Sequence, residues 1–185
     1  MREIEIKVSL KDPEAALAAL TKAGVVLSEP KEQHDVVYCL PQDLHAENNP
    51  STNWLRIRTE NGATVYFTLK RSVTGSLDSI EHETVVEKGD ELAKILEYLG
   101  YVVYSDLTKI RRTGHTGDSI EICFDNVPPL GGFIELEKLC DMDVNGAAVE
   151  QELFAVLDEL GIAYGERMTR GYDELMNEYH ATNEE

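Results

Sequence analysis

The 185-residue chain has little of what marks secreted, zinc-binding or membrane proteins. Its three cysteines, Cys39, Cys123 and Cys140, are odd in number and far apart, so neither a disulfide framework nor a zinc site is expected. We instead expect each cysteine to be a small buried hydrophobic residue in a reducing cytoplasm. No run approaches the roughly 18 apolar residues of a membrane helix, and the first ten residues lack the apolar segment of a signal peptide. We therefore expect a cytoplasmic protein with no membrane partner.

Basic residues are also scarce. The chain has 17 Lys and Arg against 35 Asp and Glu, which gives a formal net charge of −18. This balance argues against a nucleic-acid partner or an anionic membrane surface. An anionic ligand would need a local cluster of the few basic residues. The 42% of apolar residues supply a hydrophobic core, and the length fits one domain, which we place at residues 1–180 with an acidic tail at 181–185.

Alternation of apolar and polar residues with a period of two dominates the chain. It predicts eight strands, at residues 2–10, 34–40, 53–59, 63–70, 79–87, 101–112, 119–125 and 132–140. Helices are expected at 12–24, 90–99, 145–161 and 170–179. Segments 41–52 and 71–79 are predicted to be loops, and the Asn61-Gly62 dipeptide predicts a hairpin turn. The predicted class is α+β with a largely antiparallel sheet.

Local signals define the helix ends. Asp12 is expected to cap the first helix and Gly24 to end it, whereas Asp90 is expected to open the second and Asn145 the third. The pair Gly114/Gly117 is expected to supply a turn. The buried face of the second helix is predicted to consist of Leu92, Ile95, Leu96 and Leu99.

Charged residues occupy one face of almost every predicted strand. In a strand, residues i and i+2 point the same way, so Glu3, Glu5 and Lys7 share one face. A single strand of this kind is typical of a sheet that faces water. The same pattern recurs, however, in the segments LRIR (55–58), LK (69–70), IEHE (80–83), KIR (109–111), IEICFD (120–125) and FIELEK (133–138).

Two structures would explain these charged faces: an open sheet with its charged side in water, or a closed barrel with a charged lumen. Like charges side by side destabilise a simple surface. A lumen that holds cations and an anion makes the same arrangement favourable, so the pattern favours the tunnel. Carboxylates are hard ligands suited to Mg²⁺ or Mn²⁺, and Lys and Arg are suited to phosphate oxygens. A linear triphosphate with metal ions would fit such a site.

The ordered motifs resemble the CYTH superfamily, the triphosphate tunnel metalloenzymes. The E-x-E-x-K of Glu3, Glu5 and Lys7 comes first, followed by HDVVY (34–38), LRIR, LK, E-H-E (81–83) and K-I-R. The last segment, DNVPPLGGFIELE (125–137), is similar to the family's D-x-V-x-x-L-G-x-F-x-E-x-E stretch. With the RGYDELM segment near the C-terminus, the chain looks most like the class IV adenylyl cyclase branch. It departs from the family pattern at Ser79 and Ile80, where a basic residue often stands.

The resemblance implies a fold and a set of site residues. The implied fold is α+β, an eight-stranded antiparallel β-barrel tunnel (CYTH-like) with flanking helices. The implied metal ligands are Glu3, Glu5, Glu83, Asp125, Glu135 and Glu137. The implied triphosphate-binding residues are Lys7, Arg56, Arg58, Lys70, Lys109 and Arg111. Among these, Lys7, Glu5 and Glu135 are expected to be catalytic, and the general base is left unassigned.

The resemblance also implies the reaction class. A class IV cyclase converts ATP to cyclic AMP and pyrophosphate with Mg²⁺ or Mn²⁺. Thiamine triphosphatases and inorganic triphosphatases of the same superfamily hydrolyse their substrates, and a polyphosphate-binding module without turnover is a further alternative. The sequence leaves these open, because the base pocket would come from segments such as 41–54 and 71–79. The expected partner is ATP or another linear triphosphate, and the resemblance is compatible with a homodimer.

Overall fold

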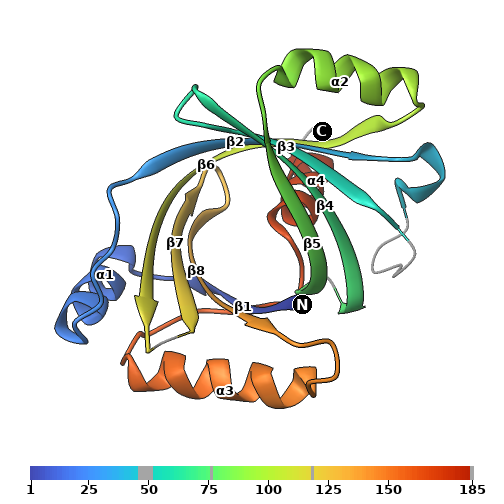
Figure 1. The fold of residues 1–185 in the computed structure, drawn as a ribbon. Coiled ribbons are helices and arrows are strands. Elements are labelled where there is room, and N and C mark those ends of the chain that lie inside the picture. Colours follow the sequence, from blue (N-terminus) through green and yellow to red (C-terminus); the bar gives the residue numbers. More distant parts are fainter. Residues whose placement is uncertain (46–51, 76, 118, 184–185) are drawn as a thin grey trace. The chain divides into compact units, whose positions relative to one another are not determined.

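The computed structural model describes residues 1–45, 52–75, 77–117 and 119–183. Two compact units make up the chain. Unit 1 consists of residues Met1–Pro30 and Ile110–Thr169, and unit 2 of Lys31–Lys109 and Arg170–Glu185. Each is described separately below, and Figure 1 labels their α-helices and the strands β1 to β8.

Unit 1 is an antiparallel sheet with two helices. Its strand order is β6-β7-β8-β1-β9, in which β6 contributes its second half. The strands are β1 (Arg2–Leu10), β6 (Val102–Thr116), β7 (Ile120–Val127), β8 (Gly131–Cys140) and the short β9 (Arg167–Met168). The helices are α1 (Pro13–Lys22) and α3 (Gly146–Glu159). Figure 1 shows α3 running along β1 and β8.

The alternation along β1 divides this sheet into an apolar and a charged face. Ile4, Ile6 and Val8 are buried in one hydrophobic cluster with Leu153 and Leu157 of α3. Because side chains alternate along a strand, the charged residues between these aliphatics point to the opposite face. Packing of the apolar face against α1 and α3 therefore fixes which side of the sheet carries the charges.

The predicted helix signals of unit 1 are confirmed. The Asp12 carboxylate accepts a hydrogen bond of 3.0 Å from the Ala15 N–H, and the Asn145 side chain accepts one from the Ala148 N–H. Gly24, with φ +80°, ends α1 in the left-handed region that glycine favours. All three cysteines are reduced and buried, as the sequence predicted.

Unit 2 contains antiparallel strands in the order β5-β4-β3-β2, next to which lies the first half of β6. Its strands are β2 (Lys31–Cys39), β3 (Trp54–Glu60), β4 (Thr64–Gly75) and β5 (Asp78–Val86). A short 3-10 helix, η1 (Pro41–Asp43), follows β2, and the α-helices are α2 (Gly89–Tyr98) and α4 (Tyr172–Asn183). The hairpin predicted at Asn61-Gly62 is confirmed, since both residues have positive φ.

The predicted loop at 71–79 is wrong. β4 continues to Gly75 and β5 begins at Asp78, with Arg71 opposite Ile80 and Ser72 opposite Ser79. Polar residues do not end a strand when a neighbouring strand satisfies their backbone groups. The register becomes irregular between Ser72 and Gly75, which places the bulge near the end of the hairpin.

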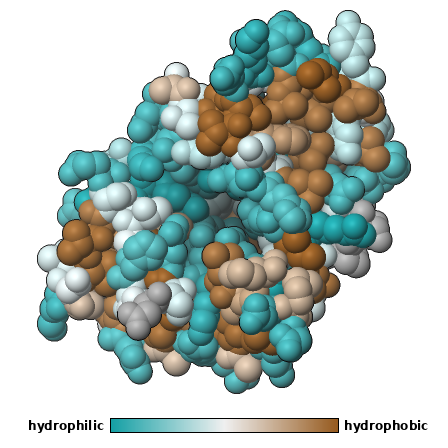
Figure 2. All heavy atoms as spheres, viewed as in Figure 1, coloured by the Kyte–Doolittle hydropathy of each residue, from teal (hydrophilic) through white to brown (hydrophobic). Residues whose placement is uncertain are grey.

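The prediction for α2 is wrong in two respects. Its N-cap is Lys88, which makes no side-chain hydrogen bond to the helix, so Asp90 lies inside the first turn. Leu96 is buried, but Ile95 and Leu99 are 53% and 66% exposed. A ten-residue helix that meets the sheet along one narrow stripe leaves neighbouring positions in water. Figure 2 shows the resulting apolar side chains (brown) at the surface in the upper part of the view, where α2 lies.

The turn predicted at Gly114 is also wrong, because Gly114 lies inside β6. A Cβ atom at this position would lie 2.9 Å from the Val26 carbonyl oxygen, so the close approach of two backbones requires glycine. Gly117, with φ +61°, does lie in the turn. The α+β class and the antiparallel pairing are confirmed, whereas the single domain over residues 1–180 stays a prediction. No helix in the described parts of the chain is long and apolar enough to span a membrane.

Candidate functional site

The charged face of unit 1 is arranged in rows by the strand register. Lys7 of β1 lies opposite Glu135 of β8, which lies opposite Cys123 of β7. In the next row, Glu5 lies opposite Glu137, which lies opposite Glu121. The pairing of three antiparallel strands thus brings Glu5 into one row with two acids that lie more than 100 residues further along the chain.

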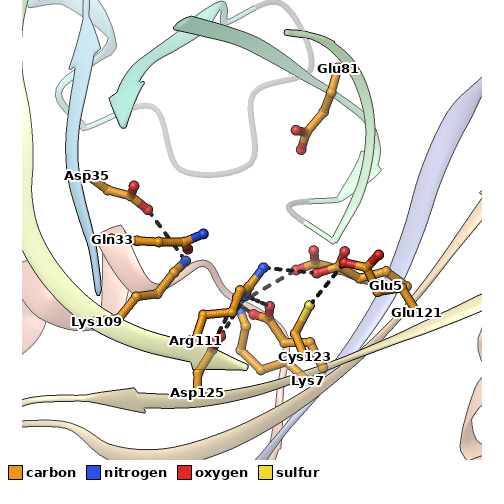
Figure 3. Close-up of polar contacts among 12 residues, drawn as sticks. Glu5, Lys7, Gln33, Asp35, Glu81, Lys109, Arg111, Glu121, Cys123 and Asp125 are labelled. Atoms are coloured by element: carbon orange, nitrogen blue, oxygen red, sulfur yellow. Dashed lines mark hydrogen bonds and ion pairs between the residues drawn. The ribbon is translucent and has the colours of Figure 1, made fainter. Parts of the chain in front are cut away.

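Two cations bind part of this acidic face. The Arg111 guanidinium of β6 donates two hydrogen bonds to Asp125, of 2.8 Å from Nε and 2.6 Å from Nη2, and also contacts Glu135. The Lys7 ammonium lies 3.1 Å from Glu135 Oε1 and 3.7 Å from Glu5 Oε1. Figure 3 shows Arg111 directed toward Asp125 and the carboxylates of β1 and β8. Asp125 and Glu135 therefore take part in ion pairs with the two basic residues of this face.

Two triads of potential metal ligands lie on the same face and share Glu137, whose Oε1 lies 3.5 Å from Arg111 Nη1. One consists of Glu3, Glu5 and Glu137, and the other of Glu121, Cys123 and Glu137. Within each triad the ligand atoms lie within 4.8 Å of one another. Three carboxylates match the hard oxygen donors that Mg²⁺ and Mn²⁺ prefer, so the first triad fits the predicted ion. The thiol of the second triad is a softer donor.

Glu137 lies partly buried among several other carboxylates. Burial raises its pKa well above the ordinary value, Arg111 opposes this rise, and the negative charges of Glu135, Glu3 and Glu5 add to it. Carboxylates crowded in this way bind either a proton or a positive ion. A divalent cation would remove the repulsion and supply a fixed positive charge for phosphate oxygens.

Unit 2 carries the other predicted basic residues on strands β3, β4 and β6. At its centre, Asp35 of β2 accepts hydrogen bonds of 2.6 and 2.7 Å from Nε and Nη2 of Arg58. The same carboxylate lies 3.4 Å from the Lys109 ammonium, a contact that Figure 3 marks. Asp35 is 4% exposed. Burial by itself raises the pKa of Asp35, but Lys109 and Arg58 outweigh burial and hold it well below its usual range.

Sequence reasoning did not assign a role to Asp35. The HDVVY segment contains it, and the alternation places it on the same strand face as Gln33 and Val37. That alternation was the one sign in the sequence that Asp35 belongs to the charged face. Its partners could not be identified, because the register that sets Asp35 opposite Arg58 is a property of the folded sheet.

A second group of charges lies on β3, β4 and β5 of unit 2. Lys70 Nζ lies 2.9 Å from Glu81 Oε1, and Arg56 Nη2 lies 3.6 Å from Glu83 Oε2. Burial alone raises the pKa of Glu81, but Lys70 and Arg56 lower it to about 2. Glu83 also accepts a hydrogen bond of 2.8 Å from Thr68. Glu83, predicted as a metal ligand, is therefore part of the ion pairs of unit 2 and of neither triad.

Aromatic residues of unit 2 lie close to this face. The Lys109 ammonium lies 5.1 Å from the ring centroid of Tyr172, the first residue of α4, within the range of a cation–π contact. Trp54 packs on Tyr104 with ring centroids 4.7 Å apart. Of the two predicted base-pocket segments, part of 41–54 lies outside the described residues, and 71–79 lies largely in strands.

Unit 2 also has a hollow of about 780 Å³ beside α2, which none of the predicted site residues lines. Its walls include Val36, Tyr38 and Ile57, which point to the opposite strand face from Asp35 and Arg58. The hollow therefore lies on the other face of the strands from the charged residues and is not part of the charged site.

Comparison with known proteins connects these arrangements to a family. The family model described as "CYTH domain" matches residues 1–172. The chain belongs to the CYTH family. This match and the structural likenesses below confirm the predicted CYTH-like α+β fold.

Relatives of this CYTH chain carry names that refer to cyclase or triphosphatase activity. A Methanocaldococcus jannaschii protein named "Putative adenylate cyclase" is 28% identical over 178 residues, covering 95% of this chain and 98% of that protein. A Vibrio parahaemolyticus structure, also named a "putative adenylate cyclase", has a TM-score of 0.76 at 21% identity and covers 95% and 97% of the two chains. A Hippeastrum protein described as a "putative adenylyl cyclase" with a dominant triphosphatase activity has a TM-score of 0.58 at 16% identity and covers 88% and 89%. At these identities, the two structures show the fold alone.

Proposed function

We propose that this CYTH protein is a metal-dependent enzyme that acts on a linear triphosphate. The observation that carries the proposal is the triad of Glu3, Glu5 and Glu137, whose carboxylate oxygens lie within 4.8 Å of one another on paired strands. Three carboxylates in this arrangement have hard-metal chemistry that a plain scaffold does not need. The proposed ion is Mg²⁺ or Mn²⁺, and the localisation in the cytoplasm and a homodimeric state stay predictions.

The basic residues are proposed to bind the triphosphate. Arg56, Arg58, Lys70 and Lys109 of unit 2 each have a carboxylate partner that holds the cation in place. Lys7 and Arg111 of unit 1 are held in the same way by Glu135 and Asp125. Cations positioned in advance lose little conformational freedom when an anion binds, which favours both affinity and alignment for reaction.

The proposed reaction is that of a class IV adenylyl cyclase. The 3′-oxygen of ATP attacks the α-phosphorus, the bond between the α-phosphorus and its bridging oxygen to the β-phosphorus breaks, and pyrophosphate leaves. The metal ion supplies positive charge for the phosphate oxygens when it is bound. Lys7, Glu5 and Glu135 are the proposed catalytic residues, and the general base is unassigned. The name of the M. jannaschii relative supports this choice.

Triphosphate hydrolysis is the alternative reaction, supported by the activity attributed to the Hippeastrum protein. Water would then attack the terminal phosphorus, and orthophosphate would be released. The same metal ligands and basic residues serve both reactions, because what differs is which phosphorus lies in line with the nucleophile. Thiamine triphosphate and inorganic triphosphate are the substrates to compare with ATP.

Product analysis tests the proposal. The protein is incubated with Mg²⁺ or Mn²⁺ and, separately, ATP, thiamine triphosphate and tripolyphosphate, and the products are resolved by chromatography. Cyclic AMP with pyrophosphate would establish the cyclase, and orthophosphate would establish the hydrolase. Glu137→Gln is expected to abolish turnover, whereas Glu152→Gln, at an exposed position of α3 beside Lys138, serves as the control. Binding without any product would indicate a polyphosphate-binding module instead.

A further inference from the structure

Gln33 of β2 has a buried side-chain oxygen that lacks a hydrogen-bond partner in the described part of the chain. The residue is 5% exposed. Its Nε2 donates a hydrogen bond of 3.1 Å to Glu60 Oε2, and Lys31 Nζ donates one of 3.0 Å to Glu60 Oε1. Gln33 Oε1 has no partner among the described residues. An unsatisfied acceptor at such a depth is uncommon in folded proteins.

The orientation of this amide is fixed by its neighbour. Burial by itself raises the pKa of Glu60, but the hydrogen bonds from Gln33 and Lys31 outweigh burial and lower the pKa below its ordinary value, so Glu60 is a carboxylate at neutral pH. A carboxylate in this state can only accept hydrogen bonds. The NH₂ group of Gln33 must therefore face Glu60, because rotating the amide would set two acceptors against each other, and the carbonyl oxygen is directed away from that pair.

The oxygen belongs to the charged face that carries the proposed triphosphate-binding residues. Gln33 and Asp35 are two positions apart in β2 and share one side of the strand. Gln33 lies opposite Glu60 in β3, and the adjacent pair on the same side is Asp35 with Arg58. Figure 3 shows the Gln33 amide beside Lys109 and Asp35. Gln33 is thus an uncharged neighbour of the cations that would hold phosphate.

The chemistry of an acceptor restricts what it can bind. A phosphate oxygen is itself an acceptor at neutral pH and cannot satisfy Gln33 Oε1. A ligand of this position must offer an N–H or O–H group. We propose that Gln33 Oε1 accepts a hydrogen bond from an amine or hydroxyl of the organic part of the substrate, and so favours a nucleoside triphosphate over inorganic triphosphate. This inference rests on the proposed function.

The test compares two ligands that differ in the organic part. Binding of ATP and of tripolyphosphate is measured by calorimetry with Ca²⁺ as the divalent ion, for the wild type and for Gln33→Met, a side chain of similar length without the amide. One hydrogen bond contributes about 0.5–1.5 kcal/mol, which corresponds to a loss of roughly two- to tenfold in ATP affinity. The affinity for tripolyphosphate is expected to stay the same or rise, since that ligand has no donor for the oxygen.

Controls separate this effect from damage to the fold. Glu152→Gln, at an exposed position of α3 beside Lys138, is the matched control, and the ratio of ATP to tripolyphosphate affinity is expected to stay at the wild-type value. A Gln33→Met protein that unfolds in urea like the wild type but loses affinity for both ligands equally would overturn the inference, because the partner of Oε1 would then be common to both ligands. Unchanged affinity for both would also overturn it, because water would then satisfy the oxygen. If neither ligand binds the wild type, the proposed function fails as well.

Discussion

The buried carboxylate of Asp35 should stabilise unit 2 strongly, and its replacement by asparagine tests this directly. Asp35→Asn keeps the volume of the side chain but removes the negative charge that faces Arg58 at 2.6 Å and Lys109 at 3.4 Å. The three side chains are between 4% and 11% exposed, so water offers little compensation. Removing one partner of a buried ion pair typically costs about 3–5 kcal/mol. We expect a decrease of about 3 kcal/mol or more in the free energy of unfolding.

The assay is equilibrium urea unfolding followed by circular dichroism at pH 7. The control is Glu91→Gln, which removes the charge from an exposed pair with Lys94, in which both side chains are 61% exposed. Such exposed pairs contribute at most about 1 kcal/mol. A loss below about 1 kcal/mol for Asp35→Asn would show that the pair is not dehydrated as the structure indicates and would refute the reasoning.

The dependence on pH provides a second test of Asp35. Its pKa lies below the value of about 3.9 of an unfolded chain, because Lys109 and Arg58 outweigh the effect of burial. The stabilisation is therefore fully present above the unfolded pKa and is lost as the pH falls below it. The difference in stability between wild type and Asp35→Asn should be constant between pH 5 and 8 and decrease below about pH 4. A difference that grows with acidity would contradict the assigned sign.

Three further predictions concern the core, the cysteines and the metal ligands. Leu153→Ala, at a fully buried position of α3, should lower the free energy of unfolding by about 2–5 kcal/mol, whereas Leu99→Ala, 66% exposed, should change it by less than about 0.5 kcal/mol in the same urea titration. Cys39 should resist iodoacetamide at pH 8 in the native protein and react in urea, as followed by mass spectrometry, because burial raises its pKa to about 11. Glu3→Gln should weaken Mn²⁺ binding by about tenfold or more in calorimetry. Glu121→Gln should weaken it by less, because the triad of Glu121 includes a thiol. A larger loss of affinity for Glu121→Gln than for Glu3→Gln would move the proposed metal site to the second triad.

The sequence by itself determined the class of the fold and the chemistry of its charged strands. Period-two alternation is a local property, so it assigned Glu3, Glu5 and Lys7 to one face and the aliphatics of β1 to the core without knowledge of the neighbouring strands. Caps such as Asp12 and Asn145 were predictable for the same reason, since the side chain and its backbone partner lie three residues apart. The order of the motifs sufficed to identify the family, which the domain match confirms.

Tertiary structure decided which charged residues meet. The register of β1, β7 and β8 brings Glu5, Glu137 and Glu121 into one row, and that of β2 and β3 sets Asp35 against Arg58. Pairing between distant strands depends on backbone hydrogen bonds and core packing that no short segment encodes. The same limit explains two errors of the sequence analysis. At 71–79 the polar residues form strand because β4 and β5 pair with each other there. In α2 the narrow contact of the helix decided which of its apolar residues are buried. Burial and pKa values, including that of Glu137, arise from these long-range neighbours and exist only in the folded chain.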